Sequence, residues 1–189
     1  MSFNIPKEEN PFVGYRALRI CLREKEMFKT QLRAILRSSS YGDVRIMFPM
    51  ISCVSELREA KALLEGAKDE LRAKKIRFNE DIETGIMVEI PSAVFSADSL
   101  IKECSFFSIG TNDLTQYLFA ADRLNENVSE YYRPFHPALF RAIKAVSDAA
   151  EKAGKWCGIC GELGGMGLAL PVLAGLGVKE LSMTPQLLP

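Results

Sequence analysis

Short apolar runs alternate with longer amphipathic stretches along this chain. The short runs predict β-strands at residues 44–50, 85–90, 106–110, 156–160 and 180–183. Apolar residues that recur every three or four positions predict helices near residues 13–37, 52–75, 92–102, 137–153 and 168–173. A long polar segment fills the interval between residues 110 and 137. This alternation of apolar strands and helices indicates an α/β fold with a parallel sheet covered by helices.

The number of strands bears on the kind of sheet. A parallel sheet of this type is either an open doubly wound sheet or a (β/α)8 barrel. Five strands are too few for a complete barrel, and 189 residues are fewer than the roughly 250 that such barrels take. Residues 1–12 are polar, contain two prolines and predict a loop. We therefore expect one partial domain over residues 1–189, cut inside a larger fold whose first strands are missing.

Composition narrows the class of protein. A hydrophobic content of 48% supports a buried core, and the 24 basic residues balance the 24 acidic ones. This balance gives no bulk attraction to nucleic acid or to an anionic membrane. No apolar run approaches the roughly 20 residues that span a bilayer, and residues 1–10 lack the layout of a signal peptide. We expect a soluble, cytoplasmic protein without a nucleic-acid or membrane partner.

Polar side chains stand where two of the predicted strands end. Glu89 interrupts the apolar run at 85–90, and Asn112 and Asp113 directly follow the run at 106–110. Two carboxylates at the carboxyl ends of neighbouring parallel strands would share a hard cation such as Mg²⁺ and leave coordination sites for substrate oxygens. The alternatives are a glutamate that points outward and a Thr-Asn-Asp turn that caps a helix.

The five cysteines are odd in number and lie mostly in apolar segments, which favours a reducing compartment over a disulfide framework. Cys157 and Cys160 have the CxxC spacing of redox and zinc sites, but the single histidine, His136, and no second cysteine pair would make a poor zinc site. We expect Cys157 in the core and Cys160 at the end of its strand. A thiol there is mostly protonated at neutral pH and can act as a general acid. His136 is expected to be a packed turn residue.

Two arginines are candidates for binding an anion. Arg123 lies in the polar segment after Asp113, where its guanidinium would fork onto a phosphate or carboxylate, or form a surface ion pair with Asp122 or Glu126. Arg16 lies near a predicted helix start, where it would be solvated or would serve a phosphate bound at the helix terminus. Spacing alone singles out neither arginine.

Six longer motifs occupy residues 10–16 (NPFVGYR), 46–50 (IMFPM), 85–92 (GIMVEIPS), 108–116 (SIGTNDLTQ), 134–137 (PFHP) and 158–162 (GICGE). In this order they closely resemble enzyme I of the bacterial sugar phosphotransferase system, over nearly the whole chain. The resemblance implies a (β/α)8 barrel domain that binds phosphoenolpyruvate (PEP), present here with about five of its eight βα units. It also implies a preceding phosphohistidine domain and a domain that docks the carrier protein HPr.

The resemblance assigns roles to the candidate residues. Glu89 and Asp113 would hold Mg²⁺. Asn112, Asp113 and Arg123 would form the substrate site, where Asn112 and Arg123 contact PEP. Arg16 would bind the phosphoryl group of PEP. Two carboxylates with a cation and two arginines would supply the charge neutralisation that phosphoryl transfer requires.

Cys160 is the implied catalytic residue, because its thiol would protonate the methylene carbon of the enolate and give pyruvate. The full-length enzyme would transfer the phosphoryl group of PEP to an enzyme histidine and on to HPr, for sugar uptake. The barrel domain is also the one that would form the homodimer in this family.

The chain departs from the family pattern in two respects. Met166 stands where the family has an aspartate after its Cys-Gly-Glu motif, so the loop beside Cys160 is expected to be looser. Two further phosphate-binding arginines and the phospho-accepting histidine are absent from the chain, and His136 is not in the phosphohistidine motif. We therefore expect negligible activity from this chain alone.

Two other readings remain open. Pyruvate phosphate dikinase and PEP synthase share the Gly-Thr-Asn-Asp-Leu and Cys-Gly-Glu motifs; residues 5–12 favour enzyme I, whereas Gly164 and Gly165 lean slightly the other way. The second of these readings is a scaffold that dimerises or binds without catalysis.

Overall fold

The computed structural model describes residues 7–188 and divides the chain into two compact units. The first unit comprises Met1–Val44 and Glu59–Ile82, and the second comprises Arg45–Arg58 and Glu83–Pro189. Within residues 7–188, no helix is both long and apolar enough to cross a membrane. The sheet lies entirely in the second unit.

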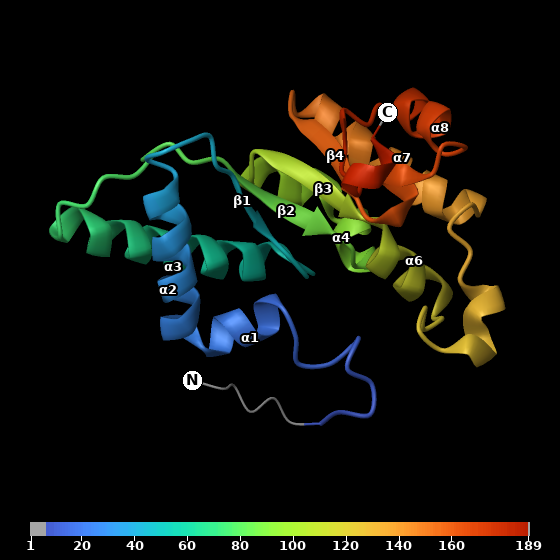
Figure 1. Ribbon diagram of the computed structural model, residues 1–189, viewed down its shortest axis with the longest axis horizontal. Coiled ribbons are helices and arrows are strands. Elements are labelled where there is room, and N and C mark those ends of the chain that lie inside the picture. Colours follow the sequence, from blue (N-terminus) through green and yellow to red (C-terminus); the bar gives the residue numbers. More distant parts are fainter. Residues whose placement is uncertain (1–6, 189) are drawn as a thin grey trace. The chain divides into compact units, whose positions relative to one another are not determined.

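Five strands form a single parallel sheet (Figure 1). They pair in the order in which they occur in the chain: β1 (Ile46–Phe48), β2 (Thr84–Val88), β3 (Phe106–Gly110), β4 (Trp156–Cys160) and β5 (Glu180–Leu181). Every neighbouring pair is parallel. The predicted α/β fold with a parallel sheet is therefore confirmed, and each predicted strand is present, although the first and last are shorter than expected.

The two faces of the sheet differ in chemistry, because alternate side chains along a strand point to opposite sides. One face is apolar and at most 1% exposed, with side chains from Ile86, Val88, Phe107, Ile109 and Ile159. The other face, which we call the site face, carries Met87 of β2, Ser108 of β3 and Cys160 of β4. Polar candidates therefore share one side of the sheet.

The helices and 3-10 turns of the second unit follow the strands. They are α4 (Pro91–Phe95), α5 (Ala97–Leu100), η1 (Ile101–Glu103), α6 (Thr111–Phe119), η2 (Glu126–Tyr131), α7 (Pro137–Lys152), η3 (Glu162–Gly165), α8 (Leu170–Gly175) and η4 (Pro185–Leu187). The helix predicted near residues 92–102 is broken, because Ser96 leaves the helical conformation at φ −110° and ψ 14°. The end predicted for α7 is confirmed by Gly154, which adopts φ +68° just beyond the helix.

Helix α6 occupies the start of the segment that the hydrophobic pattern predicts to be polar, where a capped helix after the Thr-Asn-Asp turn is the alternative prediction. Three polar residues on it, Asp113, Thr115 and Gln116, are at most 8% exposed, alongside the fully buried Leu114. Because much of its buried face is polar, α6 lacks the apolar periodicity that reveals other helices. Buried polar groups need partners, and the Thr115 hydroxyl donates to the Thr111 carbonyl at 2.7 Å.

The first unit is helical. It contains α1 (Leu18–Arg23), α2 (Lys25–Ser38) and the part of α3 (Val54–Ala73) that follows Arg58. The stretch predicted as one or two helices near residues 13–37 is thus two helices, which meet at Glu24. Leu32 and Leu36 of α2 are buried, and Arg33 forms an ion pair with Glu70 of α3 at 2.6 Å.

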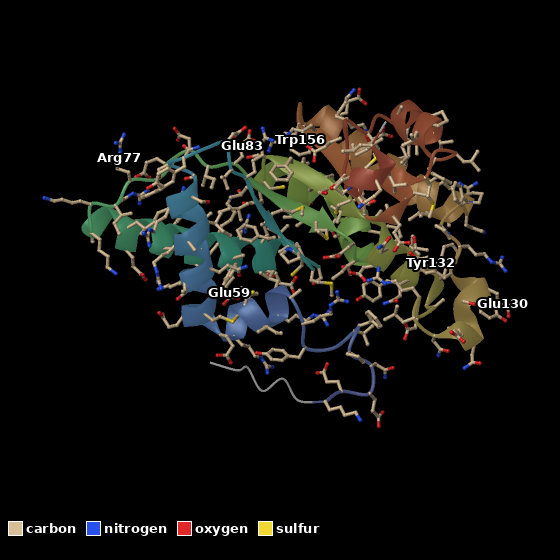
Figure 2. All side chains as sticks on the ribbon, in the orientation of Figure 1. Glu59, Arg77, Glu83, Glu130, Tyr132 and Trp156 are labelled. Atoms are coloured by element: carbon tan, nitrogen blue, oxygen red, sulfur yellow. The ribbon has the colours of Figure 1, made fainter. Side chains whose placement is uncertain are left out.

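Gly85 provides a test of the packing on the site face. The ring of Phe106 stacks on the ring of Trp156, with 4.5 Å between the two ring centroids. Trp156 is the first residue of β4 and is labelled in Figure 2. A Cβ added at Gly85 would lie 2.3–2.5 Å from three atoms of the Phe106 ring. We expect Gly85→Ala to displace this stack and to lower the free energy of unfolding by about 1–3 kcal/mol, measured by urea denaturation.

Gly66→Ala is the matched control for this variant. Gly66 lies inside α3, and a Cβ there would meet only the flexible end of Lys29, at 3.6 Å. Alanine at this position should stabilise the helix by about 0.5–1 kcal/mol. Equal destabilisation by both substitutions would show that the clash with Phe106 is not the cause.

Candidate functional site

The carboxyl ends of β2, β3 and β4 lie side by side, because these strands are neighbours in a parallel sheet (Figure 1). Val88 pairs with Ile109, and Gly110 pairs with Cys160. Glu89 directly follows β2, Asn112 and Asp113 lie in the first turn of α6 directly after β3, and Cys160 ends β4. The sheet therefore brings together the strand-end residues that the sequence singled out.

Glu89 is buried, with 3% of its surface exposed, so the alternative of an outward-pointing side chain is wrong. Its Oε1 accepts a hydrogen bond from the backbone N–H of Met50 at 2.6 Å. A Cβ added at Gly110 would lie 2.9 Å from Glu89 Cβ and 3.1 Å from Glu89 Oε2. Glycine after β3 thus leaves the space that this carboxylate occupies.

Asp113 is 8% exposed, in the first turn of α6. The turn predicted as an alternative does begin a helix, and the N-terminal end of a helix favours a negative charge. Arg123 approaches Asp113, with 3.9 Å between its Nη2 and Asp113 Oδ1. The side chain of Gln116 fixes the backbone here, because its Oε1 accepts from the Arg123 N–H at 3.0 Å. The acidic and basic candidates of this segment are therefore neighbours.

Asn112 connects α6 to the end of β4. Its Oδ1 accepts from the Glu162 N–H at 3.1 Å, and its carbonyl accepts from the Tyr132 hydroxyl at 3.4 Å. Figure 2 labels Tyr132, which lies in the segment after η2. Gly161 has φ +120°, and a Cβ there would lie 2.5 Å from Thr111 Oγ1. Glycine is therefore required at this close approach.

Cys160 lies in a polar environment on the site face. The Ser108 hydroxyl donates to Cys160 Sγ at 3.2 Å, and Sγ lies 3.6 Å from the Ile109 carbonyl oxygen. Burial is the main cause that raises the pKa of the Cys160 thiol, and the hydrogen bond from Ser108 acts in the opposite direction. The thiol therefore remains protonated at neutral pH, which is the state that a general acid needs.

Cys157 of the CxxC motif and His136 of the PFHP motif contribute to packing and lie outside the set of candidate site residues. Cys157 is 2% exposed, as predicted for a core residue, and burial raises its pKa to about 12. Among residues 7–188, no cluster of three or more His, Cys, Asp or Glu side chains is placed to hold a metal ion. His136 packs against Phe119 and accepts from the Ala138 N–H through Nδ1 at 3.1 Å, as expected for a packed turn residue.

Arg16 lies in the first unit, whereas the other candidates all lie in the second. Its guanidinium is 5.7 Å from the centroid of the Phe12 ring. Its predicted contact with a phosphoryl group stays a prediction.

A cavity of about 570 Å³ opens beside Asn112 in the second unit. Its lining includes Gly161, Glu162, Met166 and Thr184. The Met166 N–H donates to the Leu163 carbonyl at 3.2 Å, which closes the turn η3. Glu89, Asp113 and Cys160 do not line this cavity, which meets the candidate residues only at Asn112. The looser loop predicted from Met166 stays a prediction.

Sequence reasoning missed three residues of this site: Ser108, Gln116 and Tyr132. All are polar, and Ser108 and Gln116 are at most 8% exposed. The signal that could have identified Ser108 is its position two residues before the glycine that ends β3, on the same face of the strand.

Two comparisons of the sequence with known proteins agree on one family. The whole chain, residues 1–189, matches the family described as PEP-utilising enzyme, PEP-binding domain. Phosphoenolpyruvate-protein phosphotransferase of Priestia megaterium is 55% identical over 181 residues, which are 96% of this chain and 32% of that protein. The same enzyme of Bacillus subtilis is 56% identical over 180 residues, which are 95% of this chain and 32% of that protein. The chain thus spans about a third of the length of these curated relatives.

A solved structure supports the fold alone. The crystal structure of a citrate lyase from Burkholderia xenovorans matches with a TM-score of 0.54 at 16% identity, over 79% of this chain and 53% of that chain. The family match over residues 1–189 is a match of sequence, so it does not depend on the likeness to the citrate lyase structure. The chain belongs to the PEP-utilising enzymes, in the family of their PEP-binding domain.

Proposed function

We propose that this chain is the PEP-binding part of an enzyme I, and that it binds PEP together with Mg²⁺. The observation that carries the proposal is the placement of Glu89, Asp113 and Cys160 at the adjoining ends of three parallel strands. The relatives described above, 55% and 56% identical to the chain, are phosphoenolpyruvate-protein phosphotransferases, which favours enzyme I over pyruvate phosphate dikinase or PEP synthase.

The fold that we propose for the complete domain is a (β/α)8 barrel, to which residues 1–189 contribute part. The support is the strand order, because the five parallel strands follow one another without the reversal that marks a doubly wound sheet. Such a barrel places its active site at the carboxyl ends of the strands, where the candidate residues lie. The likeness to the citrate lyase fold is consistent with this assignment.

The donor set fits Mg²⁺, which is held through one or two carboxylates together with substrate oxygens and water. Glu89 and Asp113 would be its protein ligands, and both are too buried for isolated carboxylates to be favourable without compensation. When bound, the cation would neutralise charge on the phosphoryl group and on the enolate.

The remaining side chains would act on the substrate directly. Arg123, beside Asp113, would contact PEP together with Asn112, which is held by the Glu162 N–H. Arg16 would bind the phosphoryl group. Cys160 would donate its thiol proton to the methylene carbon of the enolate, which gives pyruvate. The phosphoryl group would pass to a histidine of the full-length, cytoplasmic enzyme and then to HPr, and that enzyme would act as a homodimer.

Glu89→Gln tests the cation site. The amide keeps the size of the side chain and can still accept from the Met50 N–H, but it removes the negative charge. We expect the affinity for PEP in the presence of Mg²⁺ to fall at least about tenfold, or about 1.4 kcal/mol, by titration calorimetry. Chelation of Mg²⁺ should weaken binding by the unsubstituted protein in the same way.

The control for this variant is Glu151→Gln, an exposed carboxylate near the end of α7. It should bind PEP as the unsubstituted protein does. Mg²⁺-dependent binding that survives Glu89→Gln would remove Glu89 from the cation site, and no binding of PEP by any variant would leave only a scaffold.

Cys160→Ser tests the proton donor. A serine hydroxyl is a much weaker acid than a thiol, so pyruvate formation should fall by about 100-fold or more, while PEP affinity changes little. The measurement is pyruvate formation from PEP with HPr and Mg²⁺, in the enzyme with its phosphohistidine domain. Cys53→Ser is the control, and equal loss in both variants would contradict the assignment.

Three of the four cysteines of the second unit, Cys53, Cys157 and Cys160, should differ in reactivity in a predictable order. Hydrogen bonding to Ser55 lowers the pKa of Cys53, whereas burial raises the pKa of Cys160 and raises that of Cys157 to about 12. A lower pKa gives more thiolate, which is the form that iodoacetamide alkylates. At pH 8 we expect Cys53 to react first, then Cys160 and last Cys157, as followed by mass spectrometry.

Cys104 is also in the second unit, but it is buried and is not part of this comparison. In urea the three compared thiols should react at similar rates, because the folded environment is lost. Alkylation of Cys160 as fast as that of Cys53 in the folded protein would show that its thiol is not held in the protonated state.

A further inference from the structure

The candidate proton donor is held by a residue that is outside the set assigned above. Ser108 lies in the middle of β3, 8% exposed, and its hydroxyl donates to Cys160 Sγ at 3.2 Å across 52 positions of sequence. The pairing of β3 with β4 explains the contact. Gly110 pairs with Cys160, so Ser108 stands one side-chain repeat earlier on the same face, and Gly110 has no side chain to separate them.

The Cys160 thiol makes two contacts with β3: its sulfur accepts a hydrogen bond in one and donates in the other. The Ser108 hydroxyl gives its proton to the sulfur, and the sulfur in turn lies 3.6 Å from the Ile109 carbonyl, which accepts. Together they fix the side chain of Cys160 against β3 in one orientation. Without these two contacts, the Cys160 side chain would be free to rotate about the Cα–Cβ bond, and the sulfur could take other positions.

We propose that Ser108 is a positioning residue for the proton transfer by Cys160: its hydroxyl orients the sulfur and stabilises the thiolate that remains when the proton has left. This inference rests on the proposed function. In the step, the S–H bond breaks and its proton forms a C–H bond at the methylene carbon of the enolate. The electron pair of the S–H bond stays on sulfur, and the enolate oxygen becomes the ketone carbonyl of pyruvate.

The charge change in this step explains why a hydroxyl is suited to the position. A hydrogen bond to a thiolate is charge-assisted and stronger than one to a neutral thiol. The Ile109 carbonyl favours the neutral thiol and opposes the thiolate. Glu89, directly after β2, and Glu180 of β5 are the carboxylates whose charge acts on Cys160, and both also oppose a negative sulfur. Ser108 is the side chain that favours the product state, together with a backbone hydrogen bond at Cys160 itself.

Ser108→Ala tests the proposal through two measurements on the full-length enzyme, with its phosphohistidine domain. In the first, the pH profile of Cys160 alkylation should move upward by about one unit, because the donor to the thiolate is lost. In the second, the exchange of pyruvate methyl protons with deuterium, which is the reverse of the step, should slow by about threefold or more with Mg²⁺ present. PEP affinity should not change, because Ser108 is not assigned to the substrate.

Two further variants separate positioning from a structural effect. Ser147→Ala removes another buried hydroxyl, 2% exposed in α7, and should leave both measurements unchanged. Ser108→Thr retains a hydroxyl and should restore the alkylation profile and most of the exchange rate. If Ser108 were only structural, its loss would lower the free energy of unfolding but would leave the pH profile of Cys160 alkylation unchanged.

The outcomes distinguish this inference from the function on which it rests. If the unsubstituted protein binds PEP and catalyses the exchange, but Ser108→Ala does both equally well, Ser108 has no positioning role. If the unsubstituted full-length enzyme neither binds PEP nor exchanges the methyl protons, the proposed function fails and the role of Ser108 fails with it.

Discussion

The parallel pairing of β2, β3 and β4 is the constraint on which the candidate site depends. Val88 pairs with Ile109 and Gly110 pairs with Cys160, and this register sets which side chains share a face. Side chains alternate with a period of two along each strand, so a slip of one residue would turn Cys160 toward the opposite face. The apolar residues of that face resist such a slip, because the same movement would expose Ile109 and Ile159, which are both at most 1% exposed. The hydrophobic core therefore determines the position of the chemistry.

Burial of polar groups at this edge requires compensation from several parts of the chain. Glu89 receives the N–H of Met50, from the end of β1, and Asn112 receives the N–H of Glu162, from beyond β4. Each donor is a backbone group at the end of a different strand, so its position is set by the sheet and needs no side-chain ordering. A partly satisfied polar network is costly in a medium of low dielectric. Backbone donors at strand ends supply hydrogen bonds to these buried side chains with little loss of conformational entropy.

Two glycines have the complementary role, since they provide space. Gly110 leaves room for the Glu89 carboxylate, and Gly161, at φ +120°, brings the end of β4 close to Thr111 and Asn112. A side chain at either position would separate adjacent strand ends by more than the observed contacts allow. The glycines in the Gly-Thr-Asn-Asp and Cys-Gly-Glu motifs thus have a steric explanation within the second unit.

The sequence was informative where burial is apolar and uninformative where it is polar. All five strands could be predicted because continuous apolar runs identify buried parallel strands. The apolar pattern does not reveal helix α6, since Asp113, Thr115 and Gln116 are buried on it, and only the Thr-Asn-Asp turn at its start indicates it. Glu89, Asp113 and Cys160 could be selected because they follow strands. Ser108 lies within a strand and was not selected; its position could have pointed to the site face, but its contact with Cys160, 52 positions away, is revealed only by the register.

The same edge of the sheet accommodates a group suited to a cation and a group suited to donating a proton, and the difference lies in their partners. Removal from water disfavours the charged form of a carboxylate and of a thiol alike. At Glu89 the Met50 N–H, a donor on a rigid backbone, opposes this effect at 2.6 Å. At Cys160 the opposing contact is one neutral hydroxyl at 3.2 Å, and a carbonyl on the same strand favours the proton-bearing thiol. The ends of β2 and β4, on either side of β3, can therefore hold a carboxylate and a thiol in one buried site, because each is compensated by a different set of fixed dipoles.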